Sequence, residues 1–393
     1  MVIARVVSFS SCNFATMATR KHISFVLLVA LFFPFIFHSA AYPYRSSAIK
    51  AGYWPTWTIS YSPPSSIDLS LFTHVFYAFV QVDSSTFALA VSADDDRMLK
   101  NFSAAIHAHH RPVKALLSIG GGDSNSAFSA LAASAASRTT FIESTIAVAR
   151  RYDLHGLDLD WEFPQNAKEM ADYAALLLEW RAATESEAAA TRRPRLLLTA
   201  AVYFAPSFFL SDDKRSYPIA QMNAGLDWIN VMCYDFHGSW DTTATGEHAA
   251  LYDPQSNISA SYGLEAWVAA GMPRMKVVMG MPLYGKTWKL KDPSQHGVGA
   301  PAVGVGPGDS GVLLYSEVVE FNRNSSATVV HDEVMTAAYS YFGTSWIGYD
   351  DPWSVARKIK YARRHGLGGY FFWAIGYDKH WSVSRTAWRA WGH

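Results

Sequence analysis

Three acidic residues in the segment His155–Pro164 are spaced two apart: Asp158, Asp160 and Glu162. Side chains of a β-strand alternate between its two faces, so this spacing predicts all three carboxylates on one face, about 6.6–6.8 Å apart along the chain. Unpaired buried charges cost several kcal/mol, so such carboxylates pair or share protons. An exposed edge strand would also alternate charged and uncharged residues, but the intervening residues are too apolar for one.

Coupled carboxyl groups have a specific chemical use. Like charges within reach of each other disfavour double ionisation, which keeps one carboxyl group protonated at working pH. Glu162 is the last of the three, at the expected carboxyl end of the strand. A protonated carboxyl group there can protonate the oxygen of a glycosidic bond. The spacing therefore predicts a glycosidase with Glu162 as its proton donor.

Eight short apolar runs, separated by longer amphipathic stretches, must position these acids. The stretches Arg138–Tyr152 and Glu169–Ser186 place apolar residues near helical spacing. Strands that alternate with helices predict a parallel sheet, and eight of them predict an α/β fold, a (β/α)8 TIM barrel with its catalytic groups at the carboxyl ends of the strands. The runs predicted as strands are Ile49–Trp54, His74–Val80, Val113–Ile119, Gly156–Asp160, Leu196–Val202, Trp228–Met232, Lys276–Met281 and Gly369–Trp373.

Two segments differ from this alternation. Between the seventh and eighth strands, residues 286–345 predict a small inserted α+β subdomain. At the N-terminus, residues 1–41 have the pattern of a signal peptide: a basic segment, an apolar run shorter than the ~20 residues of a membrane span, and small residues before Tyr42. Met17 is an alternative start. We therefore expect a mature chain of residues 42–393, secreted to the extracellular space or vacuole and not anchored in a membrane.

Composition narrows the class of protein. The 393 residues are 50% hydrophobic with a formal net charge of zero, which excludes global disorder and argues against a nucleic-acid partner. Loss of Cys12 with the leader would leave Cys233 without a disulfide partner. The sequence predicts no metal site and no cofactor, and a monomer is the default expectation. Sequons for N-glycosylation occur at Asn101, Asn257 and Asn324.

Three motifs in order along the chain resemble glycoside hydrolase family 18, with plant class V chitinases as the nearest group. They are the Asp-x-Asp-x-Glu of residues 158–162, Ser-Ile-Gly-Gly at 118–121 and Met-Cys-Tyr-Asp at 232–235. The resemblance extends from about Ile49 to Trp391. Further segments similar to class V chitinases are Gly52–Trp54, Leu251–Pro254, Met281–Gly285, Trp346–Asp350 and Gly369–Trp373.

The resemblance implies a retaining mechanism in which the acetamido oxygen of the substrate is the nucleophile. It assigns Glu162 as general acid and then base, and Asp160 as the acceptor of the acetamido N–H. It also implies that Asp158 shares a proton with Asp160, that Tyr234 donates its hydroxyl to the acetamido oxygen, and that Trp373 is the floor under that sugar.

Other substrate contacts implied by the resemblance are Tyr53, Asp235 and Tyr284, and Trp288 is a further predicted substrate contact. Phe163 departs from the family, which usually has Tyr at that position, and the role of His237 is open. Tryptophans that are candidates for outer sugar subsites are Trp57, Trp240, Trp288 and Trp353.

Three functions remain open at this point. The first is a chitinase acting on chitin or chitooligosaccharides, which the complete set of acids favours. The second is a lectin or inhibitor that binds chitooligosaccharides on the same fold. The third is a hydrolase of another N-acetylglucosaminyl substrate, such as a glycoprotein N-glycan core or bacterial cell-wall sugars.

Overall fold

The computed structural model describes residues 48–122, 124–209 and 213–392, and the predicted leader lies outside them. Within these residues, eight parallel strands form a closed barrel, because β1 pairs with both β17 and β2. The α/β barrel prediction is confirmed, and all eight predicted strands are present. In barrel order they are β1 (Ile49–Pro55), β17 (Gly369–Trp373), β10 (Val277–Pro282), β9 (Trp228–Val231), β6 (Leu197–Val202), β5 (Gly156–Asp160), β4 (Lys114–Gly120) and β2 (His74–Val82).

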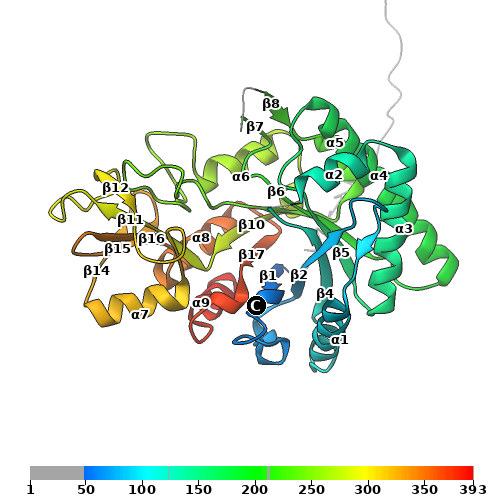
Figure 1. Ribbon diagram of the computed structural model, residues 1–393, viewed down its shortest axis with the longest axis horizontal. Helices are drawn as coiled ribbons and strands as arrows, with labels where there is room; N and C mark the ends of the chain where they lie inside the picture. Colours follow the sequence, from blue (N-terminus) through cyan, green and yellow to red (C-terminus); the bar gives the residue numbers. More distant parts are fainter. Residues whose placement is uncertain (1–47, 123, 210–212, 393) are drawn as a thin grey trace, which may run out of the picture. The chain divides into compact units, whose positions relative to one another are not determined.

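Helices follow the barrel strands and surround the sheet (Figure 1). Several begin at capping side chains: Ser92 accepts from the backbone of Asp95, and Asn166 accepts from that of Glu169. Both predicted helices are present, as α3 and α4. The helices outside the insertion are α1 (Ala93–His107), α2 (Asn125–Ala132), α3 (Ala135–Arg151), α4 (Ala167–Thr191), α5 (Ile219–Gly225), α6 (Ala260–Ala269), α8 (Pro352–Arg364) and α9 (Ser382–Trp391).

Short elements lie in the connections between these helices and strands. The 3-10 helices are η1 (Thr56–Thr58), η2 (Pro64–Ser66), η3 (Leu69–Leu71), η4 (Arg274–Lys276) and η5 (Ile375–Tyr377). Strand β3 (Leu89–Ala90) pairs antiparallel with β2, and β7 (Ser207–Phe209) forms a hairpin with β8 (Lys214–Ser216).

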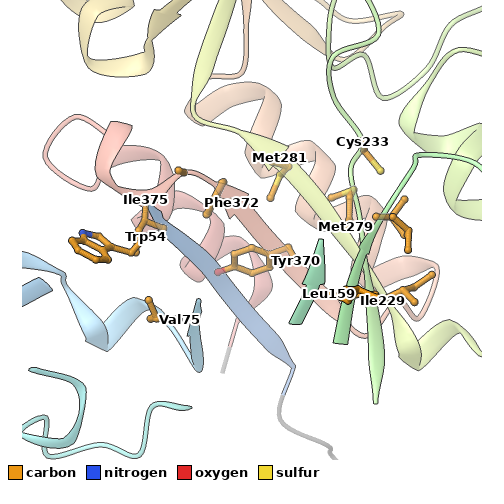
Figure 2. Packing of buried hydrophobic residues seen from close by; sticks show 14 of the residues in the cluster. Trp54, Val75, Leu159, Ile229, Cys233, Met279, Met281, Tyr370, Phe372 and Ile375 are labelled. Carbon is orange, nitrogen blue, oxygen red and sulfur yellow. The ribbon is translucent and has the colours of Figure 1, made fainter. Parts of the chain in front are cut away.

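Two hydrophobic layers hold the barrel. The outer layer packs strands against helices, and Figure 2 shows part of it, with Leu159, Ile229 and Met279 carried by different strands. A smaller cluster, which includes Phe76 and Phe371, is separate from this layer. Full burial of one such side chain contributes about 1.5–3 kcal/mol to folding. These layers fix the strands whose ends carry the acids.

The insertion between β10 and β17 has its own sheet and core. Figure 1 shows its elements, coloured yellow to orange, gathered at one side of the barrel. Its sheet has the order β12-β11-β16-β15-β14, and β13 also pairs with β11. The elements are β11 (Tyr284–Leu290), β12 (Ala302–Val305), β13 (Val312–Leu314), α7 (Tyr315–Ser325), β14 (Thr328–Asp332), β15 (Ala337–Phe342) and β16 (Ser345–Tyr349).

The described residues also bear on two sequence features, a possible membrane span and the lone Cys233. Among residues 48–122, 124–209 and 213–392, no helix is long and apolar enough to cross a membrane. Cys233 is a buried free thiol, and burial raises its pKa to about 12. A thiol with so high a pKa carries almost no nucleophilic thiolate at neutral pH.

Candidate active site

The solvent exposure of the three acids increases along strand β5 and the two residues that follow it. Asp158 is fully buried, Asp160 is 4% exposed at the strand end, and Glu162 follows two residues later and is half-buried. Trp161 points to the other side, where its ring stacks on Phe128 of α2 with the centroids 5.6 Å apart. The strand period therefore separates the acids from the helix-facing residues, as the spacing predicts.

Asp158 accepts hydrogen bonds from side chains of four other barrel strands. Its Oδ2 accepts from the hydroxyls of Tyr53 at 2.9 Å and Ser118 at 2.7 Å. Its Oδ1 accepts from the hydroxyl of Thr199 at 2.6 Å and from Asn230 Nδ2 at 3.4 Å. Burial raises the pKa of Asp158, and these donors act against that rise by stabilising the charged form.

Sequence reasoning missed Thr199 and Asn230. Both are inward polar residues on strands that are otherwise apolar, Leu197–Val202 and Trp228–Val231. A polar residue buried in such a strand needs a partner, so these positions carried a usable signal. Their common partner, however, becomes visible only in the closed barrel.

Asp160 is paired with Glu162. Burial, followed by the charges of Glu162 and Asp158, raises the pKa of Asp160 well above its ordinary value. Asp160 is hydrogen-bonded to Glu162, while its Oδ1 is buried without a partner among the described residues. The hydrogen-bond partner of Asp160 here is Glu162, while both oxygens of Asp158 accept from other donors, and the predicted proton sharing between Asp158 and Asp160 stays a prediction.

Two glycines hold β4 close to the acid strand. Gly120 has a φ of +114°, and a Cβ at this position would lie 2.3 Å from the carbonyl oxygen of Asp160. The next residue, Gly121, donates its backbone N–H to that same oxygen at 2.9 Å. A side chain at position 120 would displace Asp160, so this motif shapes the barrel around the acids.

A cavity of about 810 Å³ opens above Asp160 and Glu162. Trp373, half-buried at the end of β17, belongs to its wall. The indole stacks on Phe79 at 5.5 Å and contacts Tyr53 edge-on at 5.6 Å. These contacts fix the ring orientation and present an aromatic surface beside the acids.

Tyr234 lies in the same cavity wall as the two outer acids. Burial, followed by the negative charges of Asp160 and Glu162, raises the pKa of Tyr234 well above its ordinary value. Its hydroxyl therefore keeps its proton and can donate a hydrogen bond into the cavity.

Asp235 forms a charged group on the cavity wall with partners from the insertion and the preceding loop. Its Oδ1 accepts from the hydroxyl of Tyr284 at 2.8 Å and lies 3.1 Å from Lys286 Nζ. The ring of the fully buried His248 places Nδ1 3.6 Å away. Burial alone would raise the pKa of Asp235, but His248, Lys286 and Tyr284 together lower it to about 2. Asp235 is therefore a carboxylate at neutral pH.

The structure corrects three predicted sugar contacts. Trp288 is 1% exposed, packs edge-on against Trp346 in the insertion core and donates to the Asp241 carbonyl, so it offers no face to a sugar. Tyr53 is also 1% exposed and lies behind the cavity, where it supports Asp158. Trp353 is not part of the cavity wall.

Other sequence candidates do reach the cavity. Trp57 and Trp240 line it, and each is more than half exposed. Phe163 also lines it and packs edge-on against Tyr203 with the ring centroids 5.3 Å apart. The Nδ1 of His237 lies 2.9 Å from Asp241 Oδ2, which assigns this histidine to loop structure.

No metal centre is formed by the part of the chain that the structure describes: no group of three His, Cys, Asp or Glu side chains there could hold an ion. The chemistry that the carboxyl groups of this site can perform is proton transfer. Glu162 stands at the cavity wall next to Asp160, and Asp235 holds a fixed negative charge on the same wall.

Comparisons with known proteins agree with this geometry. Residues 49–378 match the model of glycosyl hydrolases family 18. The chain is 49% identical over 334 residues to Nod factor hydrolase protein 1 of Medicago truncatula, covering 84% of this chain and 86% of that protein. It is 46% identical over 353 residues to class V chitinase CHIT5 of Lotus japonicus, covering 89% and 88%.

Solved structures give the same result. A family 18 chitinase from Cycas revoluta in complex with (GlcNAc)3 superposes with a TM-score of 0.84 at 44% identity, covering 88% of this chain and 100% of that one. The chitinase-like agglutinin of Robinia pseudoacacia superposes with a TM-score of 0.81 at 39% identity over the same shares. With these matches across the whole barrel, the chain belongs to glycosyl hydrolases family 18, among the plant class V chitinases.

Proposed function

We propose that this protein is a chitinase that hydrolyses β-1,4-linked N-acetylglucosamine polymers. The observation that carries the proposal is the pair Asp160–Glu162 at the wall of an aromatic-lined cavity, held over a carboxyl group with four hydrogen-bond donors. The relatives named as class V chitinases support the substrate class.

In the first step, Glu162 protonates the oxygen of the glycosidic bond as that bond breaks. The acetamido carbonyl oxygen of the sugar over Trp373 attacks the anomeric carbon and closes an oxazolinium ring. The partnerless Oδ1 of Asp160 is suited to accept the acetamido N–H, and the Tyr234 hydroxyl is suited to donate to the acetamido oxygen.

In the second step, the now ionised Glu162 takes a proton from water, and that water opens the oxazolinium ring at the anomeric carbon. Attack from the acetamido face and then from the opposite face gives two inversions, so the product retains its configuration. Asp158 is placed to influence the charge of Asp160 throughout, because its own position is fixed by four strands.

The experiment is mass spectrometry of N-acetylglucosamine hexamer incubated with the wild-type protein and with Glu162→Gln. We expect shorter oligomers from the wild type alone, while calorimetry shows that Glu162→Gln still binds the hexamer. Equal turnover by the two proteins would refute the assignment of Glu162. The product lengths report where along the oligomer the chain is cut.

The second candidate is a lectin, which the similarity to a chitinase-like agglutinin supports. A lectin would bind the hexamer in calorimetry and release no new reducing ends. The third candidate, a hydrolase of other N-acetylglucosaminyl substrates, would leave the hexamer intact and cleave a high-mannose glycoprotein or peptidoglycan. The complete acid set favours the chitinase over both.

Secretion is part of the proposal, and it rests on the leader pattern of residues 1–41. The expected mature chain begins near Tyr42. N-terminal sequencing of protein recovered from the medium of expressing cells tests this, and a protein retained inside the cell with residues 17–41 intact would contradict it.

A further inference from the structure

We propose that Asn257 carries an N-linked glycan at the rim of the active-site cavity, and that this glycan restricts long polymeric substrates while short oligomers enter freely. The inference rests on the proposed chitinase function and on secretion. Asn257 is followed by Ile258 and Ser259, which completes the acceptor sequence for N-glycosylation.

Among the described residues that line the cavity, one of the three sequon asparagines is present, Asn257. Asn101 is on α1 and Asn324 is on α7, and both are exposed away from the cavity wall. Asn257 is equally exposed but lines the cavity together with Ile258. A glycan at Asn257 would therefore lie next to bound substrate, whereas glycans at Asn101 and Asn324 would not.

Hydrogen bonds within the loop that carries Asn257 fix its conformation. Asp253 accepts from the backbone N–H of Gln255 at 2.8 Å and from the hydroxyl of Ser256. The Ser256 hydroxyl in turn accepts from the backbone N–H of Ile258 at 3.1 Å. Such local side-chain bonds fix a turn. The first sugar would thus be attached at a fixed place on the rim.

The base of the same loop is anchored to both parts of the fold. The N–H groups of Leu251 and Tyr252 donate to the carbonyl of Met335 in the insertion at 3.0 and 3.1 Å. The N–H of Ala260, the first residue of α6, donates to the carbonyl of Ala250 at 3.0 Å. These bonds hold both ends of the loop in place beside the cavity.

The neighbourhood of Asn257 also offers a surface for a sugar. Ile258 and Tyr262, both in the cavity wall, are 42% and 45% exposed. On the other side of Asn257 lies a shallow depression of about 530 Å³, and Tyr262 also borders it together with Tyr252. The asparagine therefore stands on a ridge between the cavity and this depression.

Strand order shows how a substrate would meet this ridge. Trp373 ends β17, and the barrel order β1-β17-β10-β9 continues toward the strand that precedes the Asn257 loop. In this proposal, a short oligomer over Trp373 stays within the cavity of about 810 Å³. A longer chain that continues toward the β9 side crosses the rim at Asn257, where a bulky glycan would obstruct it.

The test compares protein secreted from eukaryotic cells with unglycosylated protein made in bacteria. Peptide mass spectrometry after enzymatic release of N-glycans shows whether Asn257 is occupied. The kinetic readout is kcat/KM for a soluble chitin polymer divided by kcat/KM for the tetramer. We expect Asn257→Gln to raise this ratio about tenfold in secreted protein, equal to 1.4 kcal/mol, and to leave it unchanged in bacterial protein.

Matched variants separate the glycan from the side chain. Ser259→Ala removes the acceptor sequence but keeps Asn257, and Ser259 makes no capping bond to α6, so it should reproduce the gain in secreted protein. Asn101→Gln and Asn324→Gln should leave the ratio unchanged. An unoccupied Asn257, a gain in bacterial protein as well, or equal gains from all three sequons would overturn the proposal. Failure of the bacterial wild type to cleave tetramer would instead refute the chitinase function.

Discussion

Tyr53→Phe tests whether Asp158 is a buried carboxylate held by its donors. Tyr53 is 1% exposed, and its hydroxyl donates to Asp158 Oδ2 at 2.9 Å. The replacement removes one oxygen atom and keeps the ring, so packing against Phe76 and Trp373 is preserved. The change in folding free energy then reports on the hydrogen bonds of this hydroxyl, which also accepts from Asn230 Nδ2 at 2.9 Å; of the two, only the bond to Asp158 depends on an ionisable partner.

The size of the effect follows from the charge on Asp158. A hydrogen bond to a charged group contributes about 1.5–3 kcal/mol and one to a neutral group about 0.5–1.5 kcal/mol. Because the Tyr53 hydroxyl is one of the donors that stabilise the charged form, its loss raises the pKa of Asp158 further.

The sign of the pH dependence comes from the direction of the existing shift. Burial already raises the pKa of Asp158 above its usual 3.8, so its ionisation disfavours the folded state as the pH rises from 3.8 through the folded-state pKa. Tyr53→Phe extends this loss. We expect a destabilisation of about 1.5–3 kcal/mol at pH 7 and a smaller one near pH 4, because the raised pKa of Asp158 favours its protonated form at the lower pH.

Urea unfolding at pH 7 and pH 4 measures both values, with Tyr370→Phe as the control. Tyr370 is also fully buried in the barrel, but its hydroxyl has no hydrogen-bond partner among the described residues. The control should therefore show no dependence on pH. An equal penalty for Tyr53→Phe at both pH values, or the same penalty as in the control, would show that Asp158 is not ionised in the folded protein at neutral pH.

Two further predictions concern charged groups beside the barrel. Lys358→Met should destabilise folding by about 3–5 kcal/mol in urea unfolding, because it leaves the buried Asp350 without its cationic partner. Adding Asp350→Leu should recover most of the loss, and no recovery would contradict this reasoning. Lys286→Met should raise the pKa of Asp235 from about 2 toward its usual value. Stability from Asp235 is present above pH 3.8 and lost as the pH falls toward 2, so acid unfolding followed by tryptophan fluorescence should shift to higher pH; an unchanged midpoint would exclude Lys286 as the cause.

The barrel was predictable because its signals are local. Each strand is a short apolar run between amphipathic stretches, and the acid ladder depends only on a period of two. Roles that depend on contacts across the barrel were not predictable. Tyr53 and Asn230 lie 105 and 72 residues from Asp158 in the sequence, and only closure of the sheet brings their side chains to its carboxylate.

Trp288 shows a second limit of prediction from sequence, which concerns whether a side chain is exposed or buried. A tryptophan near the end of a barrel strand suits a sugar subsite, but β11 belongs to a second sheet with its own hydrophobic cluster. The small sheet needs a large side chain in its core, and Trp288 fills this place against Trp346. The sequence predicts the insertion, but it does not show which of its aromatic residues face inward.

The insertion also contributes to the chemistry that the barrel alone cannot arrange. Burial, followed by the carboxyl groups of Glu162 and Asp158, raises the pKa of Asp160, and the described site gives Asp158 and Asp235 separate sets of donors. The barrel strands hold Asp158, whereas Lys286 and Tyr284 of β11 hold Asp235. Because Asp158 and Asp235 each have their own donors, the hydrogen-bond partner left for Asp160 is Glu162. A proton held by this pair lies at the cavity wall, where a glycosidic oxygen can be reached.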